Sequence, residues 1–151
     1  MLGLPPTLLL MLLMTGCGGS SSGPDLHPVA GTVKMDGQPL TEAMLIFTPK
    51  GGGVTAIANT DSKGDYILEY SSSAKGVPSG EYAVSISTFR PEGEVSDGAP
   101  SLPPAKERVP DVYNQKTTLA VKVPGDAGSY SFDLKAGAGK VTDPPVPKGR
   151  N

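Results

Sequence analysis

The sequence predicts an all-β sandwich of seven strands, and three observations lead to this fold class. From Val29 onward, hydrophobic residues recur at every second position, which is the period of a half-buried strand. The 3.6-residue period of an amphipathic helix is not found in this part of the sequence. Turn-forming residues interrupt the runs at short intervals, and the 151 residues include 20 Gly and 16 Pro.

The first two strands are expected at residues 29–35 and 43–48. The first strand places on one face Val29, Gly31, Val33 and Met35. It ends at Asp36-Gly37, a strong turn dipeptide. Residues 43–48 (AMLIFT) are apolar on both faces, so we expect a central strand that is covered on two sides and is the best buried of all.

The remaining strands are expected at residues 54–60, 66–70, 82–87, 117–123 and 130–134. The turn 61–65 predicts a hairpin in which Gly64 has a positive φ. Residues 71–80 are expected to form a polar connection. The clearest alternation is that of Tyr82, Val84 and Ile86 with small or polar residues.

The N-terminal segment predicts export and lipidation. An apolar run at 8–14 (LLLMLLM) is too short for a spanning helix, which needs about 20 residues. Met14, Thr15 and Gly16 then precede Cys17, the only cysteine. This pattern resembles the lipobox of bacterial lipoproteins, which implies a signal peptide at 1–16 and fatty acylation of Cys17, for example with palmitate. The alternative is an ordinary secretory signal that happens to contain a cysteine.

Lipidation at Cys17 predicts an extracytoplasmic protein held on a bacterial membrane, on the periplasmic side or at the cell surface. Residues 17–28, in which Cys17 is followed by a Gly/Ser stretch, are expected to be a flexible tether that leaves His27 exposed. The Pro-rich residues 136–151 are expected to be a disordered tail. The membrane is thus the predicted partner of the N-terminus.

Short motifs along 29–135 resemble those of one domain family. They are VxGxVxxDGxPL from Val29, FxP from Phe47, TDxxGxY from Thr60, GxYxVxI from Gly80, PxxYN from Pro110 and YxFxL from Tyr130. Their order resembles the carboxypeptidase regulatory-like, transthyretin-like domains that small bacterial lipoproteins carry alone. The resemblance implies a Greek-key, immunoglobulin-like sandwich and no particular substrate.

Composition argues against nucleic-acid binding and known enzyme classes. The net charge is −2 and no basic run is present, so the electrostatic footprint of a nucleic-acid binder is missing. A serine nucleophile needs a positioned base, and the single histidine, His27, is expected in the tether. The His-based sites of the related hydroxyisourate hydrolases and intradiol dioxygenases cannot be built with one histidine. We therefore predict no catalytic residues, no metal site and no cofactor.

Two specialised alternatives rest on pairs of residues. Asp61 and Asp65 in the fourth-strand turn are candidates for a calcium loop, but further carboxylates are missing. Lys34 and Asp133 lie on the first and last strands, as an intramolecular isopeptide bond would require. The alternation places both side chains toward solvent, which favours ordinary surface charges.

The long segment 90–110 is the candidate recognition loop, because loops of this length are usually functional or disordered. The residues singled out are Arg90, Lys106, Arg108, Tyr113 and Asn114. The sequence thus predicts a lipid-anchored, non-catalytic binding or structural module for an envelope protein or polysaccharide. The alternative is an accessory subunit of an envelope hydrolase or transporter.

Overall fold

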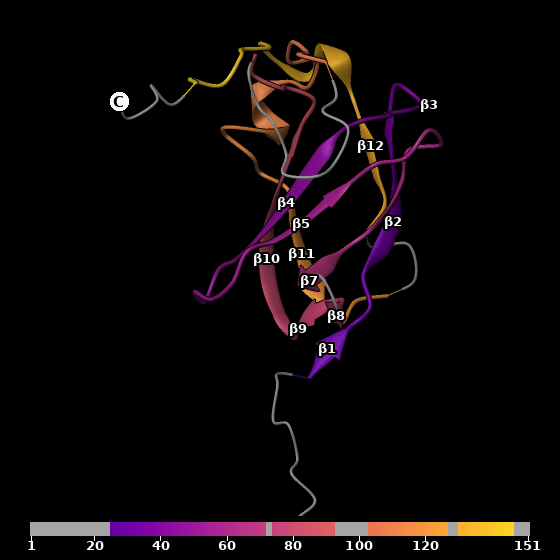
Figure 1. Ribbon diagram of the computed structural model, residues 1–151, viewed down its shortest axis with the longest axis vertical. Coiled ribbons are helices and arrows are strands. Elements are labelled where there is room, and N and C mark those ends of the chain that lie inside the picture. Colours follow the sequence, from indigo (N-terminus) through magenta and orange to yellow (C-terminus); the bar gives the residue numbers. More distant parts are fainter. Residues whose placement is uncertain (1–24, 72–73, 93–102, 127–129, 147–151) are drawn as a thin grey trace, which may run out of the picture.

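The computed structural model describes residues 25–71, 74–92, 103–126 and 130–146 (Figure 1). The expected signal peptide, the lipobox residues Met14, Thr15 and Gly16, and the predicted lipidation site Cys17 lie outside these ranges. The fold is all-β: every long element is a strand, and the described helices are two single 3-10 turns. No helix among the described residues is long and apolar enough to cross a bilayer.

The larger sheet has six strands in the order β11-β10-β4-β5-β7-β8, and every neighbouring pair is antiparallel. Its strands are β4 (Met44–Pro49), β5 (Ala56–Asn59), β7 (Glu69–Ser71), β8 (Ala74–Lys75), β10 (Gly80–Ser87) and β11 (Ala120–Val123). The pairing of β10 with β4 runs over six residue pairs and is the longest in this sheet.

The smaller sheet is built around the first long strand of the chain. Its strands are β2 (Ala30–Met35), β3 (Gln38–Pro39), β6 (Asp65–Ile67) and β12 (Phe132–Leu134). Strand β2 pairs antiparallel with β3 and β6, whereas β12 lies parallel to it, with Phe132 opposite Val33. A separate two-stranded ladder joins β1 (Leu26–His27) to β9 (Val77–Pro78).

The predicted alternation is confirmed in β2 and β10. In β10, Tyr82, Val84 and Ile86 are buried and the residues between them are half-buried. In β4, Leu45 and Phe47 are fully buried, but Met44 and Ile46 are only half-buried. The expectation that β4 is fully covered on both faces is therefore wrong, because the described residues cover its second face only in part.

The segment 66–70 is not one strand. Its first part, β6, pairs with β2 in the smaller sheet, and its second part, β7, pairs with β5 in the larger sheet. The change takes place at the fully buried Leu68, whose N–H donates to the Val29 carbonyl and whose carbonyl accepts from Gly76. The chain thus passes from one sheet to the other without a loop.

The expected tether and polar connection are also partly structured. His27 was expected to be exposed, but it is half-buried in β1, opposite the fully buried Val77 of β9. The segment 71–80 contains both β8 and β9. The first strand of the described residues consequently begins at Leu26, three residues before the predicted domain boundary.

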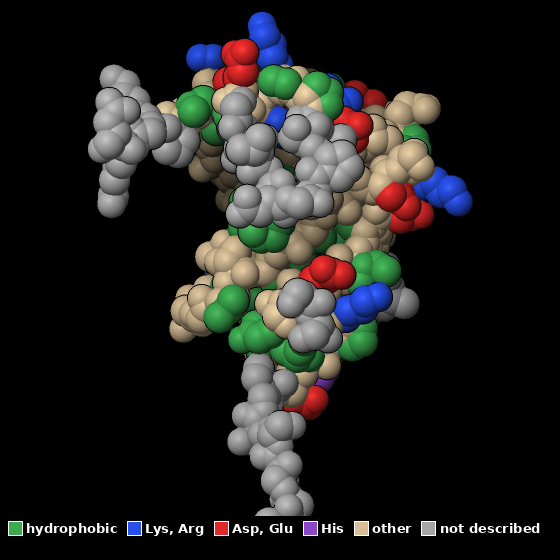
Figure 2. Space-filling model, viewed as in Figure 1, with side chains coloured by type: hydrophobic (Ala, Val, Ile, Leu, Met, Phe, Trp, Pro, Cys, Tyr) green, Lys and Arg blue, Asp and Glu red, His purple; other side chains and the backbone are tan. Residues whose placement is uncertain are grey.

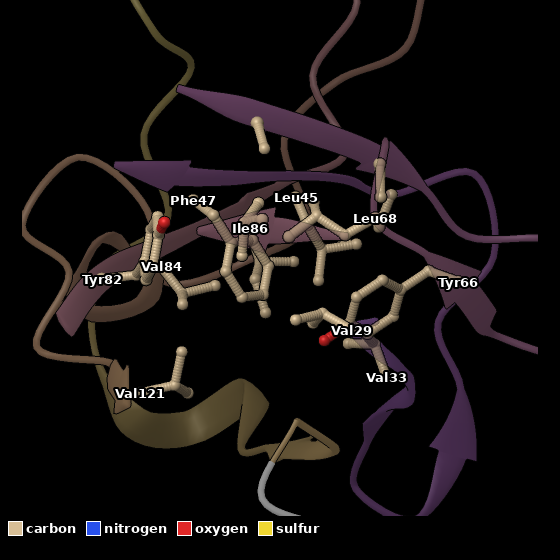
Figure 3. Close-up of a cluster of buried hydrophobic side chains, with 14 of the residues drawn as sticks. Val29, Val33, Leu45, Phe47, Tyr66, Leu68, Tyr82, Val84, Ile86 and Val121 are labelled. Carbon is tan, nitrogen blue, oxygen red and sulfur yellow. The ribbon is translucent and has the colours of Figure 1, made fainter. Parts of the chain in front are cut away.

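The two sheets enclose one hydrophobic core (Figure 3). The ring of Phe47 in β4 lies 6.1 Å from that of Tyr66 in β6 and 6.4 Å from that of Tyr82 in β10. Buried valines of β2 and β11 complete the contact between the sheets. Because hydrophobic burial is the main driving force for folding, this cluster fixes the sheets relative to each other.

Candidate binding site at the loop end

The long predicted loop is tied at its base to the end of β10. Arg90 and Ala105 form an isolated antiparallel bridge, with the Arg90 N–H donating to the Ala105 carbonyl at 2.9 Å and the reverse bond at 3.1 Å. This bridge brings together the two described flanks of the loop, 90–92 and 103–110. The site is therefore built on a fixed base.

The two arginines of the predicted binding loop fasten that base to the turn before β4. The Arg90 guanidinium donates to the Pro103 carbonyl and pairs with the Glu42 carboxylate at 3.0 Å. Arg108 donates from Nη2 to the Thr41 carbonyl at 3.0 Å. Both side chains thus hold neighbouring segments together, although neither is deeply buried.

A buried glutamate, which sequence reasoning missed, organises this end of the protein. Glu107 is only 6% exposed, and its carboxylate accepts six hydrogen bonds. The donors are the Ser87 hydroxyl, the N–H and hydroxyl of Thr88, the N–H groups of Arg108 and Val109, and the Asn114 amide. One carboxylate therefore joins the end of β10, the loop and the helical turn after it.

The predicted residues Tyr113 and Asn114 lie at a 3-10 turn, η1 (Asp111–Tyr113). Asn114 donates its amide to Glu107, and Tyr113 packs half-buried against the hydrophobic core. These contacts position the turn against the sandwich. The Lys106 ammonium, in contrast, makes no hydrogen bond or ion pair with any residue that the structure describes.

The described part of the expected tail, residues 136–146, is held against the same end. It begins with a 3-10 turn, η2 (Ala136–Ala138), and the Lys140 carbonyl then accepts from the Asp111 N–H at 2.8 Å. Thr142 donates to the Asp111 carboxylate, and Asp143 accepts from the Glu107 N–H. In contrast to the disorder expected for 136–151, this part has a defined place on the sandwich.

A shallow groove of about 340 Å³ lies between the loop base and the tail. Its lining is mostly apolar, with charged groups at Arg90, Glu92 and Lys106, and the apolar residues are Phe89, Pro91, Pro104, Ala105 and Val146. An aromatic ring and proline faces offer contact area to an apolar or sugar-like surface, while Lys106 supplies a cation. Sequence reasoning found the cations but not the groove, because the tail supplies one wall.

The calcium loop considered at Asp61 and Asp65 is a hydrogen-bonded turn in the structure. Asp61 accepts hydrogen bonds from the N–H groups of Lys63 and Asp65, which lower the pKa of Asp61 and stabilise the turn. Gly64 has the predicted positive φ, +79°. No group of three potential metal ligands occurs among the described residues.

Lys34 and Asp133 face each other in the β2–β12 ladder and are both exposed, as the alternation predicts. Asp133 accepts hydrogen bonds from Lys135 and the Gly37 N–H, which lower the pKa of its carboxyl. The pKa of Tyr66 is raised by burial, as is the pKa of Tyr82. None of these four residues, Lys34, Asp133, Tyr66 and Tyr82, lines the groove, and their roles are structural.

Comparison with known proteins supplies no function for this site. No protein-family model, no curated protein and no solved structure matches the chain. The function therefore rests on the chain's own residues and geometry.

Proposed function

We propose that this protein is a lipid-anchored, extracytoplasmic binding module without catalytic activity, which recognises an envelope protein or polysaccharide through its loop end. The proposal includes a Greek-key sandwich of the carboxypeptidase regulatory-like, transthyretin-like kind. One observation carries it: Cys17 follows the apolar run 8–14 after only Thr15 and Gly16, and eight residues separate it from the first residue of β1. A lipid on Cys17 would hold the folded domain close to a membrane.

The arrangement of the chain supports this orientation. Strand β1 lies at one end of the long axis, whereas the stretch with η1 and residues 136–146 lie at the other (Figure 1). An anchor before β1 would therefore leave the groove facing away from the membrane. That is where a module that meets envelope partners needs its recognition surface.

The chemistry of the loop end supports recognition rather than catalysis. Both oxygens of Glu107 are engaged by structural donors, and Arg90 and Arg108 fasten neighbouring segments. The groups that remain for a ligand are the Lys106 ammonium, the Glu92 carboxylate and the apolar lining around Phe89. Such a surface binds through apolar contact and one charged group of each sign, and none of its described lining residues is an activated nucleophile.

The anchor is tested by intact mass of the protein from the membrane fraction, with Cys17→Ser as control. We expect a mature chain that begins at Cys17 with added acyl mass, and no such species for the variant. An unmodified wild-type chain would refute the anchor and leave a freely secreted module.

The recognition surface is tested by cross-linking in intact cells with Lys106→Glu and, as a matched control at the other end, Lys75→Glu. Both lysines are exposed. We expect Lys106→Glu alone to lose the cross-linked glycan or protein. A stoichiometric hydrolase or transporter that is lost with Lys106→Glu would favour the accessory-subunit role, whereas equal yields for both variants would refute the groove as the binding surface.

A further inference from the structure

A second apolar surface lies at the opposite end of the sandwich, next to the start of the described chain. It consists of Leu26, Pro49, Val54, Tyr70 and Pro78, here named the tether-end patch. Leu26 and Pro78 face each other in the β1–β9 ladder, and the other three border with Pro78 a hollow of about 240 Å³. Figure 2 shows hydrophobic side chains gathered at the lower end of the described domain, the end at which Figure 1 places β1.

The residues of the patch are more exposed than those of the hydrophobic core. Val54 is 57% exposed, and the other four residues are half-buried. The adjacent Gly51 and Gly52 have open space where a side chain would stand, so the loop that carries Val54 has a bare tip. Pro78, in contrast, is fixed by a 2.9 Å hydrogen bond from the Tyr82 hydroxyl to its carbonyl.

We propose that the tether-end patch docks onto the lipid surface in which Cys17 is anchored, so that the domain rests on the membrane by this end. The inference rests on the proposed lipid anchor and adds a contact and an orientation to it.

The length of chain before β1 supports the docking. Residues 18–25 span eight positions, so the chain between Cys17 and β1 can reach no further than about 30 Å. The patch is therefore never far from the bilayer, and a linker this short gives an effective concentration in the millimolar range. Even a weak apolar contact is then populated for much of the time.

The charges around the patch define the kind of lipid contact. Lys50 pairs with Glu81 at 3.6 Å, and Lys75 stands opposite Glu69 in the β7–β8 ladder. With the exposed Asp25 beside Leu26, these charged groups show no excess of cations around the patch. The patch itself consists of aliphatic, proline and tyrosine side chains, which suit the boundary between headgroups and acyl chains. We expect docking on zwitterionic phosphatidylcholine that changes little with salt or with anionic lipid.

Single tryptophan reporters test the docking, because the chain has no Trp. Val54→Trp places the reporter in the patch, and Val146→Trp is a matched control at the groove, since Val54 is 57% and Val146 is 55% exposed. The lipidated full-length variants are reconstituted into phosphatidylcholine vesicles with or without brominated acyl chains. Flotation of the vesicles and intact mass report the anchor independently.

We expect bromination to quench the emission of Val54→Trp about twofold and to leave that of Val146→Trp unchanged, because interfacial side chains enter the acyl boundary. Acylated variants that float but show equal, weak quenching would overturn the docking and leave the anchor intact. Variants without acyl mass that fail to float would overturn both. A blue shift of Val54→Trp that depends on protein concentration and not on vesicles would place a second copy on the patch and refute the lipid contact.

Discussion

The buried Glu107 carboxylate offers the sharpest test of the fold at the loop end. Replacing Glu107 with Ala removes an acceptor that six donors share. The effect depends on which donors keep another partner. The Arg108 N–H keeps a partner, because it also donates to the Thr88 hydroxyl at 2.9 Å.

The cost follows from the donors that lose their only partner. The fully buried ones are the N–H groups of Thr88 and Val109, residues that are 2% and 0% exposed, while the Ser87 hydroxyl and the Asn114 amide, which also lose their partner, belong to half-buried residues. A buried unsatisfied donor costs about 1–3 kcal/mol, so Glu107→Ala should lower the free energy of unfolding by about 4 kcal/mol. Domains of this size are stable by only about 5–15 kcal/mol, so the loss is a large share of the total.

Urea unfolding followed by far-ultraviolet circular dichroism measures this loss. Glu69→Ala is the matched control, because Glu69 is exposed in β7, and it should change stability by less than about 0.5 kcal/mol. Glu107→Gln keeps one acceptor oxygen but turns an amide toward Asn114, so it should lose about 2 kcal/mol. If Glu107→Ala unfolds within about 1 kcal/mol of the wild type, water satisfies these donors and the reasoning is wrong.

Three further predictions concern the two sheets. Gly31→Ala should cost about 1–3 kcal/mol in urea unfolding, because its Cβ would lie 2.3 Å from the Tyr130 carbonyl oxygen; an unchanged midpoint would contradict this close approach. Tyr66→Phe loses a 2.6 Å hydrogen bond to the same carbonyl, which costs about 1 kcal/mol at neutral pH. Burial raises the pKa of Tyr66, so the stabilisation by its neutral hydroxyl is complete below the unfolded value of about 10 and is lost as pH rises further. Wild-type stability should therefore fall more steeply than that of the variant above about pH 10. For Asp61 the sign is opposite: the turn N–H groups lower its pKa, so the stability advantage of the wild type over Asp61→Asn should shrink as pH falls from about 5 to 2, and a constant difference would exclude this linkage.

The strands that have one buried and one open face were predictable from the sequence. The alternation in β10 gave the buried face correctly, because a period of two directly reports which side of a strand meets the core. The division at Leu68 was not predictable, since the alternation of Tyr66, Leu68 and Tyr70 continues unbroken while the chain changes its pairing partner. Side-chain direction is a local property, whereas strand pairing depends on distant segments.

The loop end shows the same limit more strongly. Arg90, Lys106 and Asn114 could be singled out as polar residues in a long loop, but nothing in the sequence distinguishes Glu107 from its charged neighbours. Its role arises only where β10, the loop and η1 converge. The part played by residues 136–146 is likewise set by hydrogen bonds to η1 and Glu107, because their own composition favours disorder.

The parallel pairing of β12 with β2 determines when folding can finish. Phe132 lies opposite Val33, 99 positions earlier, so the smaller sheet gains this strand only when almost the whole chain is present. Contacts between such distant positions slow folding, because the chain must close a long loop before the pairing stabilises it. Until then β2 presents an unpaired edge, which is a site for association with other chains. A chain that emerges N-terminus first would therefore depend on its last strand for protection.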